Sequence, residues 1–222
     1  MNAETPLTPA RARRIRKDAA LRRAQILLEV TQRCAALTDL NSVLAELVEL
    51  TSRELDCERG TLFLNDPSTG ELYSRVAQGD LTREIRILNS SGIAGHVYQS
   101  GAATRSDDPY QDERFNRSVD ERTGFVTRNI ACVPVRTMSG ELIGVMQSLN
   151  KRGGAFTDDD IDLLADMTNH AATILQSMQY IEEIDRIRTE LAGLQDQVTG
   201  PRDASKARLD NLGPAPKPDD PP

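Results

Sequence analysis

The sequence contains no tryptophan, and aromatic residues make up only 4% of it, so aliphatic side chains must build any core. Stacking platforms for single-stranded nucleic acid are therefore scarce. The formal net charge of -7 also disfavours nucleic acid as a partner of the whole chain, because phosphate contacts need clustered cations. No apolar run approaches the ~20 residues that span a bilayer, and the N-terminus has no secretory signal. We therefore expect a cytoplasmic protein that binds no nucleic acid and no membrane.

Cysteine and histidine, which often carry metal or nucleophile chemistry, are also few. The three cysteines, Cys34, Cys57 and Cys132, are far apart and lack zinc-ligand spacing, which predicts reduced structural thiols and no metal site. His170 lies within a helical pattern, where packing or surface exposure is expected, and His96 is open to a structural or a pocket role. Nucleophile-elbow, Walker A and His-Glu-x-x-His patterns are absent. The sequence predicts a protein that is not an enzyme, with no catalytic residue and no cofactor.

One basic run, "RARRIRKDAALRR" at residues 11–23, stands out in this acidic chain. It could touch nucleic acid or an anionic membrane surface, or it could be the solvated start of a long helix. Because no aromatic residues are interleaved and no wide apolar face accompanies the run, the second interpretation is favoured. We assign residues 1–20 as a basic N-terminal arm.

Helical segments flank a central globular domain. Leu27, Val30, Cys34 and Leu37 recur at steps of three and four, which predicts a signalling or dimerisation helix over 21–38 with a seam for a partner helix. The remaining predicted segments are a globular domain, a coiled-coil helix and a disordered tail, at residues 39–178, 179–199 and 200–222. The tail is rich in proline and aspartate and cannot bury enough apolar area to offset its ordering entropy.

The central domain reads as a mixture of helices and antiparallel strands. A helix capped by Thr38 or Asp39 comes first, and a short helix later begins at Ser90 or Ser91 and ends at Gly101. The strands are expected at 59–66, 71–78, 84–88, 130–136 and 141–151, with a polar excursion that includes a short helix at 108–125. This order predicts an α+β fold, with an antiparallel sheet, helices on one face and a ligand pocket on the other.

The longest helical pattern begins after Thr157, which can cap it, and its first turn is acidic. Its apolar register breaks between Ile181 and Ile184, so we expect it to leave the domain there as a coiled-coil extension. The heptad positions that follow are Ile184, Ile187, Leu191, Leu194 and Val198. We expect a parallel homodimer through the terminal helices. A signalling output protein would act in trans or belong to a longer chain.

Two polar segments of the domain have the composition of a binding site. "SSGIAG", at residues 90–95, opens a helix whose free backbone amides can hold an anion. "VDERTGFVTRN", at residues 119–129, offers a carboxylate and two hydroxyls that could form hydrogen bonds with a polar ring system. Small-molecule sites combine such groups with an apolar lining, which Phe125, Ile93 and Leu62 could supply.

The runs "GIAGHVYQSG", "DERFNRSVDERTGFVTRNIACVPV", "GVMQSLNK" and "FTDDD" resemble GAF domains, over about residues 40–178. The resemblance is specifically to the cyclic-nucleotide-binding GAF domains of phosphodiesterases and cyanobacterial-type adenylyl cyclases. The family's Asn-Lys-Phe-Asp-Glu signature is matched by Asn150, Lys151, Phe156 and Asp160. Its closing glutamate is replaced by Ile161. In the family, the Lys-Asp pair holds the pocket architecture and does not touch the nucleotide.

The resemblance implies a set of nucleotide contacts. The phosphate would meet the backbone amides of Ile93 and Ala94, and a tyrosine that assists it in some members is replaced by Asn116. The residues implied for the base, the ribose and the closure of the site are Thr61, Gln78, Asp120, Thr123, Thr127 and Gln147.

Three functions follow as hypotheses. The leading one is a regulatory sensor that binds a cyclic nucleotide, cAMP or cGMP, and transmits occupancy through flanking dimer helices. The alternative is a dimerisation or docking module with a vestigial pocket or a different small-molecule ligand. A third, reduction of free methionine sulfoxide, is disfavoured because Cys132 begins no cysteine cluster. The choice between cAMP and cGMP stays open.

Overall fold

The computed structural model describes residues 9–74 and 85–199. The chain divides into two compact units, Met1–Met178 and Gln179–Pro222. The helices are α1 (Pro9–Ala35), α2 (Leu40–Glu54), α3 (Gly92–Ser100), α4 (Arg117–Thr123) and α5 (Asp158–Thr199), with a short 3-10 helix, η1 (Pro109–Gln111). The strands are β1 (Cys57–Asp66), β2 (Glu71–Ser74), β3 (Ile85–Leu88), β4 (Thr104–Ser106), β5 (Ile130–Arg136) and β6 (Leu142–Lys151).

The six strands form one sheet in the order β3-β2-β1-β6-β5-β4, and all neighbours are antiparallel. In its centre, Gln147 of β6 lies between Thr61 of β1 and Cys132 of β5. The antiparallel α+β fold is therefore confirmed, including the hairpin that begins with β1. Strand β4 was not predicted, because its three residues are too few to show a periodic pattern.

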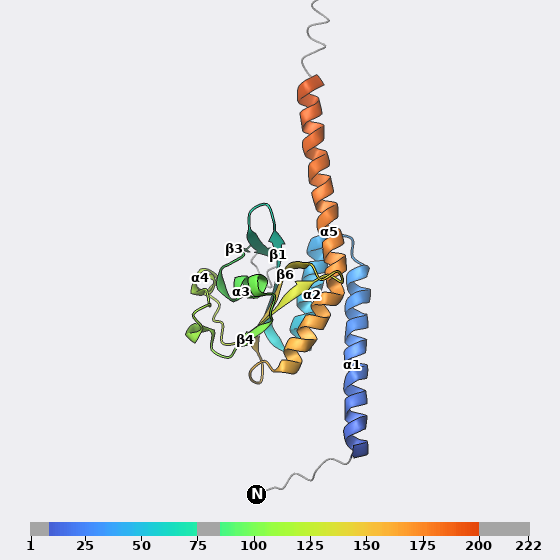
Figure 1. Cartoon of the computed structure of the whole chain (residues 1–222), viewed down its shortest axis with the longest axis vertical. Helices are drawn as coiled ribbons and strands as arrows, with labels where there is room; N and C mark the ends of the chain where they lie inside the picture. Colours follow the sequence, from blue (N-terminus) through green and yellow to red (C-terminus); the bar gives the residue numbers. More distant parts are fainter. Residues whose placement is uncertain (1–8, 75–84, 200–222) are drawn as a thin grey trace, which may run out of the picture. The chain divides into compact units, whose positions relative to one another are not determined.

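Alternation along the central strands gives the sheet two different faces. One face packs on α1, α2 and α5, and its residues include Leu62, Leu64, Ala131, Val133 and Met146. The other face packs on α3, and its residues include Phe63, Ile130, Cys132 and Val145. Helices α3 and α4 lie on the opposite side of the sheet from α1 and α2 (Figure 1). Each fully buried leucine contributes about 1.5–3 kcal/mol relative to an exposed one, so the helix-side face contributes much of the stability.

Helix α2 covers the first of these faces. Asp39, and not Thr38, is its N-cap: the Asp39 carboxylate accepts hydrogen bonds from Ser42 N at 2.9 Å and from the Ser42 hydroxyl at 2.6 Å. The helix buries its apolar positions along one stripe, which suits packing on a sheet. Two ion pairs, Arg33–Glu46 and Arg53–Glu29, connect α1 to α2.

Helix α1 begins at Pro9, so residues 11–23 belong to the start of a long helix, as the favoured interpretation of the basic run predicts. The helix continues without a break through the boundary that the sequence prediction places between a basic arm at residues 1–20 and a helix at 21–38. Two residues of the predicted seam, Val30 and Cys34, are fully buried in the same chain's core. Intramolecular packing on α2 and α5 therefore buries this part of the seam.

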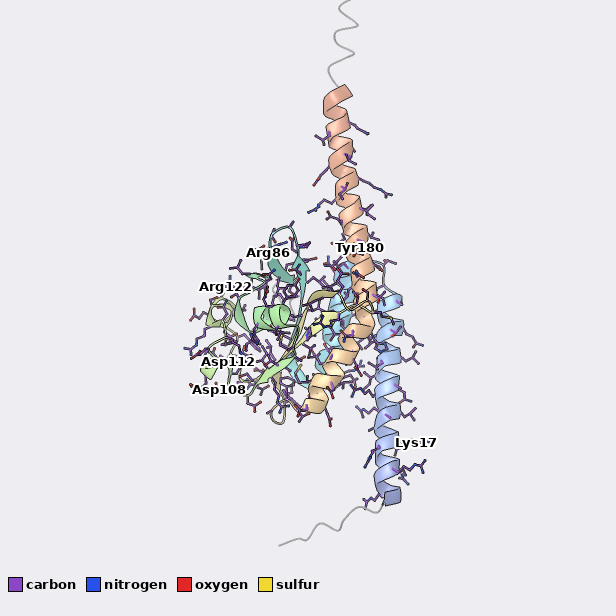
Figure 2. All side chains as sticks on the ribbon, viewed as in Figure 1. Lys17, Arg86, Asp108, Asp112, Arg122 and Tyr180 are labelled. Atoms are coloured by element: carbon purple, nitrogen blue, oxygen red, sulfur yellow. The ribbon has the colours of Figure 1, made fainter. Side chains whose placement is uncertain are left out.

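The basic run at residues 11–23 lies within α1. Lys17 is exposed on this helix (Figure 2), whereas Arg22 and Arg23 pair with Glu54 and Asp166 of the same unit. In the described ranges, 9–74 and 85–199, no helix is both long and apolar enough to cross a membrane. The last part of the predicted strand at 71–78 and the predicted tail at 200–222 lie outside the described residues.

Candidate ligand-binding site

A cavity of about 70 Å³ lies on the α3 side of the sheet, and apolar atoms form most of its lining. The lining residues are Phe63, Ile87, Ser91, Gly92, Ile93, Ala94, Phe115, Asn116, Val119, Asp120, Thr127, Ile130, Gln147 and Leu149. They come from the sheet, from the start of α3 and from residues 107–129, which we call the roof segment. The predicted pocket on the sheet face opposite α2 is thus present as a small cavity.

The floor of the cavity comes from the centre of the sheet. Phe63, Ile130 and Leu149 provide apolar surface, and Gln147 provides the one amide among these floor positions. Leu62 was expected in the lining but faces the helices, because neighbouring residues of a strand point to opposite faces. Phe125 was also expected there, yet its ring lies 4.2 Å from the Arg59 guanidinium carbon and does not line the cavity.

The N-terminus of α3 forms one side of the cavity. Ser91 is the N-cap and makes no side-chain capping bond, and the first helical hydrogen bond runs from Gly95 N to Ser91 O. The amides that precede Gly95 therefore have no partner within the helix, and the positive end of the helix dipole adds to them. A β-carbon on Gly95 would lie 2.5 Å from the carbonyl carbon of Ser90. Glycine at this position is what lets α3 approach the preceding loop so closely.

Helix α4 and its N-cap form the roof. The Asn116 side-chain oxygen accepts from Ser118 N at 3.1 Å, and its amide nitrogen donates to the Ser91 hydroxyl at 3.2 Å. One side chain therefore caps α4 and connects it to the N-cap of α3. This leaves the Asn116 amide in the place where some relatives, by the resemblance above, would have a tyrosine.

The Asp120 carboxylate accepts three hydrogen bonds from residues of the roof segment. Its Oδ2 accepts from the Tyr110 hydroxyl at 2.9 Å and from Thr127 N at 2.7 Å, and its Oδ1 accepts from the Thr127 hydroxyl at 2.9 Å. The residue is 5% exposed, so these bonds replace most of its contact with water. The carboxylate thereby connects η1, α4 and the segment before β5 within the roof segment.

The residues predicted to contact a ligand are only partly brought together. Five of them line the cavity: Ile93, Ala94, Asp120, Thr127 and Gln147. Thr61 shares the sheet face of Phe63 but is not in the lining. Thr123 is turned to its own helix, where its hydroxyl donates to Val119 O at 2.9 Å. Gln78 lies outside the described residues.

Some site residues were missed from the sequence. Phe63 could have been found from the sequence. It lies two residues from Thr61 in the same strand, so both side chains point to the same face of the sheet. No sequence pattern indicates Tyr110, since its bond to Asp120 connects two short helices, η1 and α4, across ten residues. His96 is exposed on α3 and does not line the cavity, and His170 is exposed on α5.

Comparison with known sequences identifies the family to which the chain belongs. The sequence profile of the GAF domain matches residues 39–175, which is more than half of the chain. The chain belongs to the GAF domain family. The predicted resemblance is thereby confirmed at the level of the family.

Relatives of this GAF domain include cyclic-nucleotide phosphodiesterases. The probable 3',5'-cyclic phosphodiesterase pde-5 of Caenorhabditis elegans is 32% identical over 162 residues, which cover 68% of this chain and 22% of that protein. The dual 3',5'-cyclic-AMP and -GMP phosphodiesterase 11 of Drosophila melanogaster is 29% identical over 176 residues, covering 72% of this chain and 12% of that protein. This chain therefore corresponds to less than a quarter of each relative.

Solved structures share the fold at low sequence identity. The GAF domain of a phosphoenolpyruvate-protein phosphotransferase from Coxiella burnetii has a TM-score of 0.65 at 18% identity, covering 74% of this chain and 98% of that one. The free methionine-R-sulfoxide reductase of Neisseria meningitidis, solved with its substrate, has a TM-score of 0.60 at 18% identity, covering 72% and 91%. At these identities the likeness shows a GAF fold and nothing about ligands.

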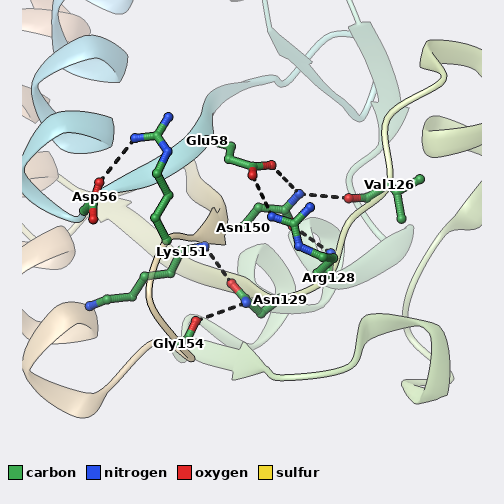
Figure 3. Close-up of polar contacts among 9 residues, drawn as sticks. Asp56, Glu58, Val126, Arg128, Asn129, Asn150, Lys151 and Gly154 are labelled. Carbon is green, nitrogen blue, oxygen red and sulfur yellow. Dashed lines mark hydrogen bonds and ion pairs between the residues drawn. The ribbon is translucent and has the colours of Figure 1, made fainter.

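The signature asparagine of this GAF domain holds the segment that carries Thr127. Asn150 is fully buried with a φ of 59°, and its side-chain oxygen accepts from Arg128 N at 2.6 Å. Its amide nitrogen donates to Val126 O at 2.8 Å and to Glu58 Oε2 at 2.9 Å (Figure 3). Asn150 thus fixes the backbone on both sides of Thr127. We call this group of contacts the Asn150 clasp.

The other signature residues join the end of β6 to the start of α5. The Lys151 ammonium pairs with Asp160, which also accepts from Thr157 N at 2.7 Å and from the Thr157 hydroxyl at 2.9 Å. Burial alone would raise the pKa of Asp160, but the Lys151 and Thr157 donors outweigh it and hold the pKa below its ordinary 3.8. Phe156 is buried beneath, with its ring centre 5.9 Å from the Lys151 nitrogen.

All three cysteines of the domain are buried and unpaired. Burial raises the pKa of Cys132 to about 12 and that of Cys34 to about 11, and it also raises the pKa of Cys57. Since the thiolate is the reactive form, these residues are protonated and shielded at neutral pH. Among the described residues, no group of three or more His, Cys, Asp or Glu side chains could hold a metal ion.

Proposed function

We propose that this GAF domain is a regulatory sensor that binds a cyclic nucleotide, cAMP or cGMP. The observation that carries the proposal is the cavity itself. It combines an apolar floor with the free amides of α3 and with the side chains of Asp120, Thr127 and Gln147. The names of the two phosphodiesterase relatives support the choice of ligand.

In this proposal the cyclic phosphate binds at the N-terminus of α3, where amide donors and the helix dipole favour an anion. The base and ribose lie between the floor and the roof segment. Asp120 accepts from donors on the ligand, and the Gln147 amide offers a donor and an acceptor. Thr61 and Thr123 are proposed contacts only if the cavity widens toward them, because neither lines it in its present form.

Binding requires the roof segment to move. The cavity of about 70 Å³ is well below the roughly 300 Å³ at which ligand pockets begin. The roof is held by Asp120, so a ligand must exchange its own donors for those of Tyr110 or Thr127. Such lid movements occur on microsecond to millisecond timescales.

Occupancy would reach the helices through β6. This strand carries Gln147 at the cavity, then Asn150 in the clasp, and then Lys151, which pairs with Asp160 at the start of α5. A ligand can shift the packing of α5 only by its differential affinity for the two arrangements. The output activity would belong to a protein in trans or to further parts of a longer chain.

Isothermal titration of the full chain with cAMP and with cGMP tests the proposal. We expect heat of binding for at least one of them, and affinity weakened about tenfold or more in Asp120→Asn and Thr127→Val, since bonds to charged groups contribute about 1.5–3 kcal/mol. Asp108→Asn is the matched control, because Asp108 lies on the exposed outer side of the roof segment (Figure 2). No heat and no thermal shift with either nucleotide at millimolar concentration would refute ligand binding.

A dimerisation or docking module with a vestigial pocket is the second candidate. The specific observation in its favour is that Asp120 already accepts three hydrogen bonds from within the domain. This candidate predicts that Asp120→Asn changes stability but leaves self-association and partner binding unchanged, with no ligand co-purifying. A co-purified cyclic nucleotide would exclude it.

We expect no reduction of free methionine sulfoxide, although a reductase shares the fold. That chemistry needs an accessible thiolate, and Cys34, Cys57 and Cys132 are all buried with raised pKa values. The absence of activity above a buffer blank, with a known reductase as positive control, is the expected result.

A further inference from the structure

Helix α1 is attached to the rest of its unit by few buried side chains. Of the α1 side chains that the structure describes, only Val30 and Cys34 are buried, whereas the shorter α2 buries eight. Ile26 and Leu27 pack partly against the same core. We call residues 21–35 of α1 the docked segment. Because little apolar area is buried along it, apolar contact holds the docked segment less firmly than it holds α2.

A row of alternating charges, which we call the charge chain, connects α1 to α2. Its contacts, in order, are Glu46–Arg33 at 2.5 Å, Arg33–Glu29 at 3.4 Å, Glu29–Arg53 at 3.0 Å, Arg53–Glu54 at 3.0 Å and Glu54–Arg22 at 3.8 Å. The hydrogen bond from the Arg53 guanidinium holds the pKa of the Glu29 carboxyl below its ordinary 4.5. Three of the five contacts cross from one helix to the other, so the charge chain supplements the sparse apolar packing of α1.

A separate ion pair connects the docked segment to α5. Arg23 Nε and Nη2 both lie 2.7 Å from Asp166 Oδ2, and the two side chains are 39% and 41% exposed. Glu29 and Arg53, at the middle of the charge chain, are exposed to a similar degree. Ion pairs that are this accessible to water are weak one by one and are screened by salt. The attachment of α1 therefore depends on contacts that solution conditions can change.

We propose that the docked segment detaches from the domain and returns as one unit while the sheet stays folded, and that the charge chain and the Arg23–Asp166 pair set how often it detaches. Local opening of this kind occurs in contiguous units that have few buried contacts. Residues 36–39 are the pivot, because they belong to neither α1 nor α2. Detachment exposes the Cys34 thiol and releases Arg53 and its carboxylate neighbours on α2.

Detachment makes α1 a regulatory element with two positions. In the docked position Arg23 contacts α5, and in the detached position this contact is lost. Any signal that favours one position shifts the equilibrium between the two. Ionic strength and charged partners act on it directly, because they compete for the side chains of the charge chain. The proposal does not depend on a ligand, since none of these side chains lines the cavity.

The alkylation rate of Cys34 in the full chain measures detachment. Iodoacetamide at pH 8, without any nucleotide, is the probe, and peptide mass spectrometry separates Cys34 from Cys57 and Cys132, which lie in strands of the sheet. At low salt, Cys34 should be nearly as protected as the other two thiols. Raising NaCl from about 0.1 M to about 1 M shortens the Debye length from about 10 Å to about 3 Å. We expect the Cys34 rate to rise several-fold and the rates of Cys57 and Cys132 to stay unchanged.

Charge reversal in the charge chain should have the same effect at low salt. Arg53→Glu places a like charge opposite Glu29, so the Cys34 rate should rise about tenfold or more while the other two thiols stay protected. The matched control is Arg14→Glu, because Arg14 is 86% exposed and pairs with Asp18 of the same helix. Its Cys34 rate should equal that of the wild type.

Charge exchange between α1 and α5 gives an independent test. Arg23→Asp alone and Asp166→Arg alone should each accelerate the alkylation of Cys34, and the double variant should return to the wild-type rate. The two positions are 143 residues apart, so this restoration requires that they meet in the docked position. A Cys34 rate that ignores salt and all these variants would overturn the proposal. So would rates that rise together at all three cysteines, because the whole domain would then be unfolding.

Discussion

At the scale of single residues, Asp120 connects the parts of the roof segment above the cavity. Its carboxylate takes donors from Tyr110 and Thr127, and it is nearly inaccessible to water. A buried carboxylate that lost these donors without replacement would be costly. The group that connects the roof segment is therefore also the group that we propose contacts the ligand.

Tyr110→Phe should separate these two roles. Loss of the hydroxyl removes one donor from Asp120 and should lower the stability of the ligand-free domain by about 1–2 kcal/mol. A ligand donor can then take the vacated site, so the thermal shift produced by a saturating cyclic nucleotide should be larger than in the wild type. Differential scanning fluorimetry gives both values.

The control for Tyr110→Phe is Tyr98→Phe, since Tyr98 lies on α3 but does not line the cavity. Its ligand-induced shift should match that of the wild type. A smaller shift in Tyr110→Phe than in Tyr98→Phe would contradict the competition between Tyr110 and the ligand.

Asp160→Asn tests the signature ion pair through its pH dependence. The pKa of Asp160 lies below 3.8 in the folded state, so its stabilisation is complete above that value and is lost as the pH falls through the folded pKa. The variant should be about 1–2 kcal/mol less stable at pH 7, having lost charge-assisted bonds to Lys151 and Thr157. Urea unfolding from pH 7 to pH 3 should show this deficit shrink below pH ~4; a constant deficit would contradict the assignment.

At the scale of elements, the Asn150 clasp attaches an irregular segment to strand β6 of the sheet through hydrogen bonds. Residues 126–128 belong to no strand, yet Asn150 binds the backbone at Val126 and Arg128. Glu58 of β1 adds bonds to Asn150 and Arg128. Thr127 is consequently presented to Asp120 from a fixed backbone.

Asn150→Gly measures the clasp without straining the chain, because glycine accepts the φ of 59°. The loss of three buried side-chain hydrogen bonds should cost about 2–4 kcal/mol. Asp56→Gly is the matched control, since Asp56 also has a positive φ of 49° but its side chain pairs only with the exposed Arg152. Hydrogen exchange should rise at residues 126–128 in Asn150→Gly alone; equal protection in both variants would mean that the clasp does not hold this segment.

Most elements could be predicted from the sequence because each has a local cause. The cap at Asp39, the glycine end of α3 and the alternation of the central strands are all set within a few residues. What could not be predicted depends on contacts between distant segments. The Tyr110–Asp120 bond is one example, and the use of the α1 seam at Val30 and Cys34 by the domain itself is another.

At the scale of the whole molecule, the three cysteines report on the integrity of the first unit. Cys34 lies in α1, Cys57 in β1 and Cys132 in β5, and each is buried. None should react with Ellman's reagent at pH 8 in the native state, and all three should react in denaturant. A native thiol that reacts at the rate of free cysteine would show that the core opens locally at that element.

Strand β6 has one further consequence. Its residues Val145, Gln147 and Leu149 belong to the cavity side, whereas Met146 belongs to the core beneath the helices. The sheet is thus a partition in which neighbouring residues of one strand contact different surroundings. Substitutions at alternate positions of β6 can therefore change the cavity side of the sheet while the residues that pack beneath the helices stay the same.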